Sequence, residues 1–398
     1  MNPDLHKLHP YPFEKLRKLK FNVIPPDDLT HISLSIGEPK HEAPKFVLTE
    51  LTRSLTNIGD YPSTLGDKSL RQAISSWLIN RFELPNDSIN PDLHVLPVTG
   101  TREALFSFTQ SIFDKTKKSL VLMPNPFYQI YEGAAILAGA VPYYLNTVVE
   151  LNNIPDYQSI PDKIWQQCQL LIVCTPGNPT GAVLTIKQLQ NLILLADKFD
   201  FIIASDECYS EIYFCNSEPP SGLLQAAAKM GRTNYERCVV FHSLSKRSNL
   251  PGLRSGFVAG DVNIIKSYFK YRTYHGCAMP PHHQAASTVA WQDEQHVIEN
   301  RELYTQKFKT FIDTLDSEID INLPDAAFYI WLKTPINDQD FAQQLYKQQN
   351  LTVLPGSFLS RTTDSGNPGE NYVRLALVTT LDECNDAANR IKSFLKTL

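Results

Sequence analysis

Residues 243 to 257 read SLSKRSNLPGLRSGF and contain two cationic side chains of special interest, Lys246 and, eight positions later, Arg254. The surrounding Ser, Asn, Pro and Gly residues are typical of a loop. Most lysines only solvate a surface. A lysine among small loop residues can also act as a nucleophile toward a carbonyl group. The other chemical groups in the chain decide between these two interpretations.

Four further side chains follow apolar runs and could bind a ligand. Asp206 comes directly after FIIAS, where a carboxylate is either a cap or a partner for a positive charge in a dry site. Tyr209, three residues later, offers a phenol that can donate to an oxygen. Asn178 lies in TPGNPTG, whose turn residues explain a turn without any ligand. Tyr128, in PNPFY, is an aromatic residue of a type more often found in a core than on a cofactor.

The segment from Thr99 to Arg102, TGTR, follows an apolar run and begins a helical pattern. Backbone N–H groups at a helix N-terminus suit a phosphate, although a plain helix start is the more common reason for such a sequence. Ser243 and Arg254 could complete a phosphate site around Gly100 and Thr101. Arg102 could add further positive charge, since guanidinium groups match phosphate oxygens.

The elements that must position these groups are short apolar runs, expected to be buried strands at 94–98, 119–123, 170–174, 201–205 and 238–242. Helical patterns lie between them, at 68–78 with Asp67 as a possible N-cap, at 101–113 and at 185–199. This alternation predicts an α/β domain with a mostly parallel sheet covered on both faces. Ligands in such sheets bind beyond the carboxyl ends of the strands. Each of the five runs is followed there by a polar turn, so we expect one shared site.

Together, a lysine, a carboxylate, a phosphate site and an aromatic ring fit one ligand, pyridoxal 5′-phosphate. Lys246 would form a Schiff base with its aldehyde. Asp206 would keep the pyridine nitrogen protonated, so that the ring can accept electrons.

Composition excludes several other classes of function. The 398 residues are 42% hydrophobic and carry a formal net charge of −5 without a long basic run, which argues against nucleic-acid binding. The N-terminus lacks the apolar core of a signal peptide, and no apolar run is long enough to cross a membrane. Seven cysteines without a CxxC pair favour free thiols in the cytoplasm. No metal-ligand cluster is expected, and the adjacent His282 and His283 are a weak candidate.

The motifs IGEP, YPSTLGDKSLRQAI, TPGNPTG, SDECYSE and SLSKRSNLPGLRSGF occur in this order, and the chain that carries them resembles the class I/II pyridoxal-phosphate aminotransferases of fold type I. The resemblance runs from LSIGEP at 34–39 to NYVRLALV at 371–378. It implies a mostly parallel central sheet sandwiched by helices, plus a smaller α+β domain that closes on the substrate. We expect an N-terminal arm with part of the small domain at 1–45, the large cofactor domain at 46–282 and the C-terminal small domain at 283–398.

The resemblance also implies a role for each matching residue. Lys246 is expected to be the Schiff-base lysine and proton shuttle, Asp206 the partner of the pyridine nitrogen, and Asn178 and Tyr209 the contacts of the ring 3′ oxygen. Tyr128 is expected to stack on the ring. Arg374 is expected to bind the substrate α-carboxylate, helped by the Gly37 N–H. The expected phosphate-binding residues are Gly100, Thr101, Arg102, Ser243, Ser245 and Arg254, with Tyr61 reaching the phosphate of a partner subunit in a homodimer.

Within this family, the segments LSIGEPKHEAP, YRTYHGCAMPPHHQAAS and NPGENYVRLAL resemble bacterial N-succinyl-LL-2,6-diaminopimelate aminotransferases of diaminopimelate and lysine biosynthesis, with glutamate and 2-oxoglutarate as the second substrate pair. Arg272 and Arg361 are candidates for binding the distal carboxylates. The alternatives are an aspartate, alanine, aromatic or acetylornithine-type aminotransferase, or a C–S lyase on the same fold. A non-catalytic effector-sensing domain is disfavoured, because only about 35 residues precede LSIGEP, too few for a DNA-reading domain.

Overall fold

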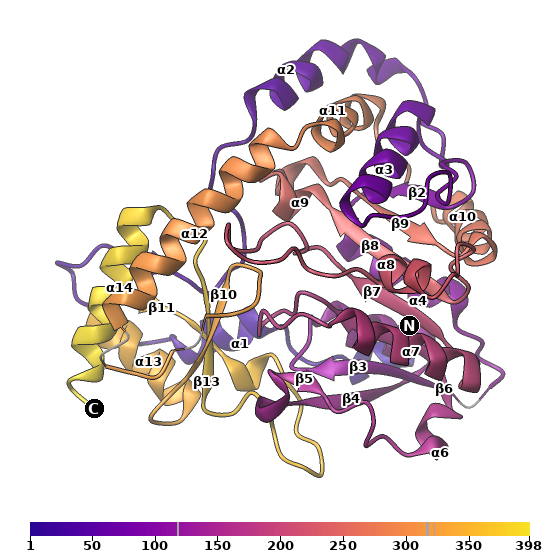
Figure 1. Cartoon of the computed structure of the whole chain (residues 1–398). Coiled ribbons are helices and arrows are strands. Elements are labelled where there is room, and N and C mark those ends of the chain that lie inside the picture. The colour runs from indigo at the N-terminus through magenta and orange to yellow at the C-terminus, as the bar shows by residue number, and fades with distance from the viewer. Residues whose placement is uncertain (118, 316–317, 322) are drawn as a thin grey trace.

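The computed structural model describes residues 1–117, 119–315, 318–321 and 323–398, and it forms a larger and a smaller part (Figure 1). The larger part is built on an eight-stranded sheet in the order β2-β9-β8-β7-β6-β3-β4-β5. These strands are β2 (Val95–Val98), β3 (Leu120–Asn125), β4 (Val141–Val148), β5 (Ile154–Pro155), β6 (Cys168–Cys174), β7 (Ile202–Asp206), β8 (Cys238–Ser243) and β9 (Gly256–Gly260).

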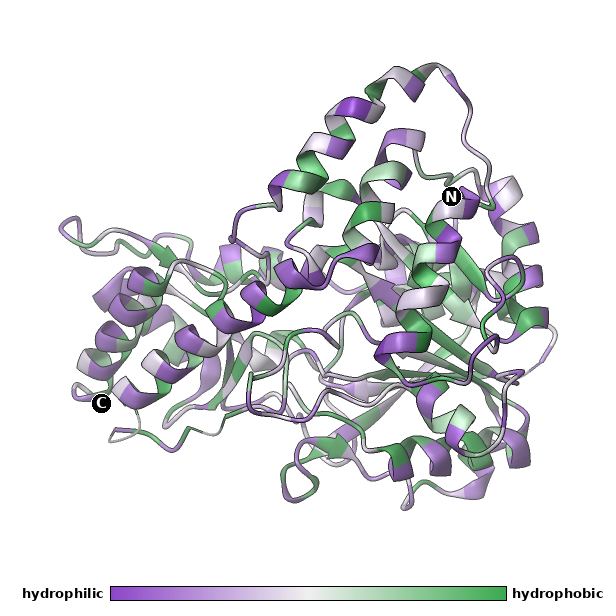
Figure 2. Cartoon of the chain, turned by 45° about the horizontal axis from the view of Figure 1, so that its top comes forward, coloured by the Kyte–Doolittle hydropathy of each residue, from purple (hydrophilic) through white to green (hydrophobic). Residues whose placement is uncertain are grey.

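All five strands expected from the apolar runs are present in this sheet. β3, β6, β7 and β8 pair in parallel, and β9 runs antiparallel between β2 and β8. β2 and β8 therefore point the same way, and the carboxyl ends of the five strands meet at one edge of the sheet. Figure 2 shows these strands as predominantly hydrophobic, as expected of a sheet buried on both faces.

Helices cover both faces of the sheet, because successive strand residues point to opposite sides. Leu122 of β3 packs into a core with α3 (Lys68–Arg81), α7 (Ile186–Phe199), α8 (Leu223–Lys229) and α11 (Pro281–Gln292). Its neighbour Val121 packs into the opposite core with α4 (Thr101–Ile112), α5 (Ile130–Ala138) and α10 (Val262–His275). The three predicted helices correspond to α3, α4 and α7. Asp67 stands at the N-cap position of α3, but its side chain makes no capping hydrogen bond.

The smaller part contains residues from both ends of the chain. β10 (Tyr329–Lys333), β12 (Leu354–Pro355) and β13 (Tyr372–Ala376) form an antiparallel sheet, and β1 (Ile32–Ser33) pairs in parallel with β11 (Leu351–Thr352). β1, β10, β11 and β13 share an apolar core with α13 (Asp338–Gln349) and α14 (Leu381–Leu395). The smaller α+β unit expected from the sequence is therefore present.

Two segments on one side of the molecule join the two parts. The chain passes from β1 to α2 (Lys45–Arg53), which packs against α11 of the larger part. It returns through α12 (Gln295–Leu315), which runs from the end of α11 to pack against α14 (Figure 1). The remaining helices are α1 (Pro12–Leu19), α6 (Asp162–Trp165) and α9 (Leu244–Arg247), together with the 3-10 turns η1 (Pro3–Lys7), η2 (Ser54–Gly59), η3 (Val149–Leu151), η4 (Pro251–Leu253) and η5 (Gly356–Phe358). None of the helices in the described ranges has the length and apolar character needed to cross a membrane.

Candidate active site

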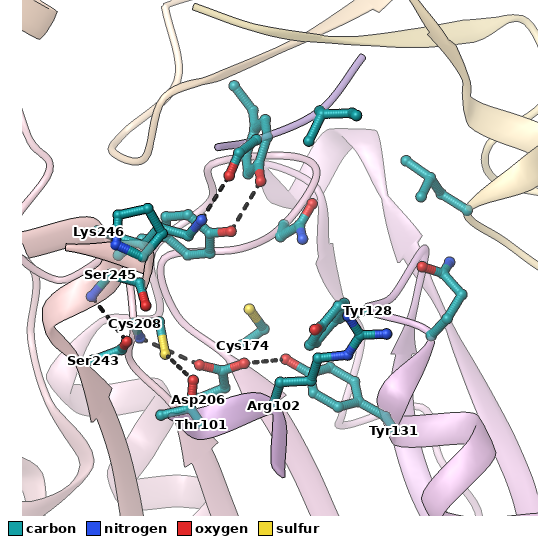
Figure 3. Close-up of a pocket in the computed structure, with 18 of the residues that line it drawn as sticks. Thr101, Arg102, Tyr128, Tyr131, Cys174, Asp206, Cys208, Ser243, Ser245 and Lys246 are labelled. Atoms are coloured by element: carbon teal, nitrogen blue, oxygen red, sulfur yellow. Dashed lines mark hydrogen bonds between the residues drawn. The ribbon is translucent and has the colours of Figure 1, made fainter. Parts of the chain in front are cut away.

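A cavity of about 400 Å³ lies at the carboxyl edge of the large sheet, where the two parts meet (Figure 3). Most of the residues singled out in the sequence line it: Gly37, Thr101, Arg102, Tyr128, Asn178, Asp206, Tyr209, Ser243, Ser245, Lys246, Arg254 and Arg374. Gly100 lies against the guanidinium of Arg254, so close that a Cβ at position 100 would clash with it. Tyr61 is not in the cavity. Its side chain is fully exposed on the surface.

Lys246 lies in the short helix α9, which starts where β8 ends. The Ser243 hydroxyl caps this helix by accepting a 3.1 Å hydrogen bond from the Ser245 N–H. The Lys246 ammonium donates a 2.6 Å hydrogen bond to the Gly37 carbonyl. Burial lowers the pKa of Lys246 to about 8, and the nearby positive charge of Arg374 acts in the same direction. A neutral amine, the nucleophilic form of lysine, is therefore accessible near neutral pH.

Asp206 is the last residue of β7 and is 4% exposed. Its Oδ2 accepts a 2.6 Å hydrogen bond from the Tyr131 hydroxyl, and its Oδ1 accepts one from the Cys208 N–H at 3.3 Å. Burial raises the pKa of this carboxyl. A cation placed against it would stabilise the ionised form, because opposite charges attract strongly in a site with little water. Asp206 therefore suits a protonated ring nitrogen.

Another part of the cavity wall suits a phosphate. Helix α4 begins at Thr101 with no side-chain cap, so its first N–H groups are free to donate to an anion. The Arg254 guanidinium crosses over Gly100, which has a φ of 92°. A residue with a Cβ would be strained at that φ and would displace the arginine. With the hydroxyls of Ser243 and Ser245, these groups form a cationic and donor-rich pocket.

Arg374 projects from β13 of the smaller part and is 4% exposed. Its Nη1 donates to Oδ1 of Asn178 at 2.9 Å, and its Nη2 donates to the Ser35 carbonyl at 2.7 Å. Among the residues that the structure describes, the buried Nε has no hydrogen-bond partner. A buried guanidinium with no carboxylate partner and an unused N–H is poised to bind an anion such as a substrate carboxylate.

The pocket fits the cofactor expected from the sequence. Pyridoxal 5′-phosphate needs an amine for its aldehyde, a carboxylate for its ring nitrogen and a cationic pocket for its phosphate. The cavity supplies Lys246, Asp206 and the Thr101–Arg254 pocket at separate places on its wall (Figure 3). The Tyr128 ring also lines the cavity, and burial raises the pKa of its phenol, which keeps the ring neutral.

The sequence did not point to several residues of the cavity. Tyr131 reads as an ordinary core aromatic in the first turn of α5, although its spacing of three from Tyr128 was a usable signal. Cys174 and Cys208 read as incidental cysteines, and the Cys208 thiol lies 3.0 Å from the Thr101 hydroxyl. The N-terminal arm contributes Tyr11, Pro12 and Phe13. No local pattern indicates that an arm so far away in sequence covers this site.

The structure contradicts the two candidates for the distal substrate carboxylates. Arg272 is fully buried outside the cavity and is held by the Glu103 carboxylate at 2.7 Å. Arg361 forms a bidentate ion pair with Glu132, at 2.7 and 2.6 Å, also outside the cavity. Both guanidinium groups are satisfied by internal carboxylates, so neither is available to a ligand.

A family model for class I and II aminotransferases matches residues 30–391. The chain is 30% identical to the LL-diaminopimelate aminotransferase of Aquifex aeolicus (strain VF5) over 395 residues, which cover 98% of this chain and 97% of that protein. Among solved structures, it is similar to an aminotransferase from Neisseria meningitidis Z2491, with a TM-score of 0.94 and 47% identity over 99% of this chain and 100% of the other. It is also similar to the aminotransferase AspB from Helicobacter pylori 26695, with a TM-score of 0.91 and 34% identity over 98% and 100% of the two chains.

Proposed function

The chain belongs to the class I and II aminotransferases, which depend on pyridoxal 5′-phosphate, and on that premise we propose that it transfers the amino group between N-succinyl-LL-2,6-diaminopimelate and 2-oxoglutarate. Three considerations support this proposal: the segments quoted from the sequence, the name of the relative from Aquifex aeolicus, which supports a diaminopimelate-type substrate without indicating succinylation, and the charge of the cavity wall. The third carries the choice between related substrates.

The described residues that line the cavity include four cations, Arg102, Lys246, Arg254 and Arg374, and one carboxylate, Asp206. We assign Lys246, Arg254 and Asp206 to the cofactor and Arg374 to the α-carboxylate. Arg102 is then the cation of this set that has no assigned ligand group. Within the described ranges its side chain forms no ion pair and no hydrogen bond, and its guanidinium lies 5.6 Å from the centre of the Tyr11 ring, which also lines the cavity.

This distribution favours a substrate whose distal end is negative. The far end of free LL-diaminopimelate carries an ammonium group beside its carboxylate, and the part of the cavity wall that the structure describes offers no second carboxylate to receive this ammonium group. Succinylation replaces this ammonium by an amide and adds a carboxylate. The unpaired Arg102 is a suitable partner for that carboxylate. We therefore reassign Arg102 from the phosphate pocket to the substrate.

In Figure 3, Arg102 lies beside Tyr128, across the Asp206 carboxylate from Ser243 and Ser245. The charge of Arg102 also counteracts the rise in the pKa of Tyr128 that burial causes, which is consistent with a guanidinium close to that phenol. Arg254, over Gly100, is thus the guanidinium for the phosphate, and Arg102 is free to bind substrate.

When bound, the cofactor supplies an aldehyde that carries the amino group and a ring that accepts electrons. The chain supplies the rest. Arg374 holds the α-carboxylate and so fixes the direction of the Cα–H bond. Lys246, with its lowered pKa, can take the Cα proton as a general base and return it as an acid. Asp206, held by Tyr131, keeps a positive charge on the ring nitrogen.

We further propose that the protein acts in the cytoplasm as a homodimer in which Tyr61 of each subunit binds the phosphate of the other. The full exposure of Tyr61 in the single chain supports this arrangement, because a tyrosine without contacts on its own chain is free to bind a partner.

The test is the absorbance spectrum of the purified protein with pyridoxal phosphate, recorded before and after each of three amino donors. We expect glutamate and N-succinyl-LL-diaminopimelate to convert the aldehyde form of the cofactor to the amine form, and LL-diaminopimelate to do so far less efficiently. Preference for unsuccinylated LL-diaminopimelate would assign the chain to the activity named for the Aquifex relative. Preference for alanine or aromatic amino acids would refute a dicarboxylate substrate altogether.

A further inference from the structure

The His41 side chain connects the two segments that join the larger and smaller parts. His41 lies on the passage from β1 to α2, four residues after Gly37. Its ring packs against Tyr304 of α12, with centroids 4.6 Å apart. Its Nε2 lies 2.6 Å from Nζ of Lys307, and its Nδ1 lies 2.7 Å from Oδ1 of Asn300, both on α12.

The partners of His41 determine its tautomer. A lysine amine next to a histidine acts as the donor, so Nε2 accepts from Lys307. Nδ1 then carries the proton and donates to Oδ1 of Asn300. Asn300 is 3% exposed and Lys307 is also 3% exposed, so both hydrogen bonds are sheltered from water. Only a neutral imidazole can accept on one side and donate on the other.

The first arm of this network reaches the main chain of Lys246. Nδ2 of Asn300 donates to the carbonyl oxygens of Lys246 and Arg247, at 3.4 Å each. Asn249, in the same loop, donates to Oδ1 of Asn300 at 2.9 Å. Since Gly37 accepts from the Lys246 ammonium, the segment from Gly37 to His41 touches this lysine at both its side chain and, through Asn300, its backbone.

The second arm reaches the smaller part. Lys307 also donates to the Val378 carbonyl at 3.4 Å, two residues beyond the end of β13, the strand that carries Arg374. Burial lowers the pKa of Lys307 to about 8, and burial together with the charge of Lys307 lowers the pKa of His41 to about 4. The other titratable groups around this lysine are Tyr304 on α12 and Glu383 and Cys384 on α14. At neutral pH His41 is therefore uncharged and keeps both hydrogen bonds.

We propose that His41 is a positioning residue. Through Asn300 it links the main chain of Lys246 to both segments that join the larger and smaller parts. Through Lys307 it links the same main chain to the strand that carries Arg374. The amine of Lys246, which moves the proton, and the guanidinium of Arg374, which orients the substrate, are thereby kept at fixed positions relative to each other. The proposal rests on the role assigned to Lys246 under the proposed function. It adds His41 to the residues that support catalysis, although His41 does not line the cavity for substrate and cofactor.

Two substitutions separate the two arms. In His41→Asn the side-chain amide nitrogen lies near the position of Nδ1, so the bond to Asn300 is retained and the bond to Lys307 is lost. In His41→Gln the side-chain carbonyl oxygen extends to the position of Nε2, so the bond from Lys307 is retained and the bond to Asn300 is lost. His31→Asn is the matched control, because His31 bonds to the Thr352 hydroxyl at 2.8 Å inside the smaller part and has no hydrogen-bond path to Lys246 in the described chain.

The first measurement is amide hydrogen exchange of the protein without cofactor. We expect faster exchange in residues 244–250 of His41→Gln, and exchange close to that of the parent protein in His41→Asn and His31→Asn. Asn300→Ala removes the same arm from its other end and is expected to reproduce the His41→Gln pattern. Equal exchange in His41→Gln and His41→Asn would overturn the proposal, whatever the activity of the enzyme.

The second measurement is the steady-state kinetics of transamination with glutamate as the amino donor. Loss of one hydrogen bond of this kind is expected to lower kcat about fivefold to tenfold in His41→Gln, with little change in KM. His41→Asn is expected to keep most of the rate. A loss confined to KM, or an equal loss in His31→Asn, would mean that His41 only stabilises the fold. If the role proposed for Lys246 were wrong, Lys246→Ala would retain turnover. This result distinguishes a failure of the proposed function from a failure of the role proposed for His41.

Discussion

The Tyr131 hydroxyl donates a 2.6 Å hydrogen bond to Oδ2 of Asp206, and both residues are buried. Burial alone pushes the Asp206 carboxyl toward its neutral form, whereas the bond from Tyr131 lowers its pKa. The tyrosine thus both orients the carboxylate and helps to keep it charged for the ring nitrogen of the cofactor.

Substitution of Tyr131 by Phe is therefore expected to lower kcat about tenfold to a hundredfold, the effect of losing one hydrogen bond to a charged group. Asp206→Asn is expected to lower kcat by several orders of magnitude, because the ring then loses its charged partner. Steady-state kinetics with glutamate checks both. Tyr235→Phe is the control, since Tyr235 is equally buried but bonds to Ser88 at 2.7 Å. An unchanged kcat in Tyr131→Phe would show that Asp206 does not need this bond.

Replacement of Lys246 by Ala is expected to abolish turnover while leaving part of the cofactor bound, because Asp206 and the phosphate pocket remain. The measurement is transamination, with bound cofactor determined by absorbance after dialysis. Lys309→Ala serves as control, because Lys309 is an exposed lysine that pairs with Asp313. Turnover of Lys246→Ala near that of the parent protein would overturn the assignment of the active site.

The lowered pKa of Lys246 predicts how cofactor loading depends on pH. Only the neutral amine attacks an aldehyde, so the loading rate of the cofactor-free protein is expected to rise with pH up to about 8 and then to level off. An ordinary lysine would show a rise that continues toward its usual pKa of about 10.4. The Glu38 carboxylate stabilises the ammonium, so Glu38→Gln is expected to shift the midpoint to lower pH. The check is stopped-flow absorbance across this pH range.

Substitution of Arg102 by Gln tests substrate selection. We expect KM to rise for N-succinyl-LL-diaminopimelate and glutamate, which carry a distal carboxylate, and to stay nearly constant for alanine as a slow alternative donor. The contrasting variant is Arg374→Lys, which loses the planar fork and is expected to raise KM for all three donors. An equal rise in KM for all donors in Arg102→Gln, together with weaker cofactor binding, would show that Arg102 binds the cofactor phosphate.

The lowered pKa of His41 predicts a contribution to acid sensitivity. The unfolded chain protonates this histidine near pH 6.5, whereas the folded protein does so only near pH 4. Between these values the unfolded state binds more protons, so the free energy of unfolding falls as the pH falls. Urea unfolding across this range is expected to show a smaller loss of stability for His41→Asn than for the parent protein. Parallel curves would indicate that His41 titrates normally in the folded state.

The sequence predicted the large sheet well because its strands are continuous apolar runs that must be buried on both faces. It gave no indication of β9, whose five residues GFVAG include two glycines, or of the outer strand β4, which is half-buried and more polar. Lys246, Asp206 and Thr101 were predictable to share a site, because each follows a strand of that sheet. The contacts of Arg374 with Ser35 and Asn178 were not, since no local pattern connects residues so far apart in the chain.

The hydrogen bond from Arg374 to the Ser35 carbonyl joins positions 339 residues apart, whereas the groups that a chain offers to the cofactor in its own cavity lie between Gly100 and Arg254. During synthesis, the groups that hold the cofactor are complete once β9 has emerged from the ribosome. The groups that hold the substrate carboxylate form only after β13 has been made and has met the first strand of the chain. A growing chain therefore acquires its capacity for cofactor well before its capacity for substrate.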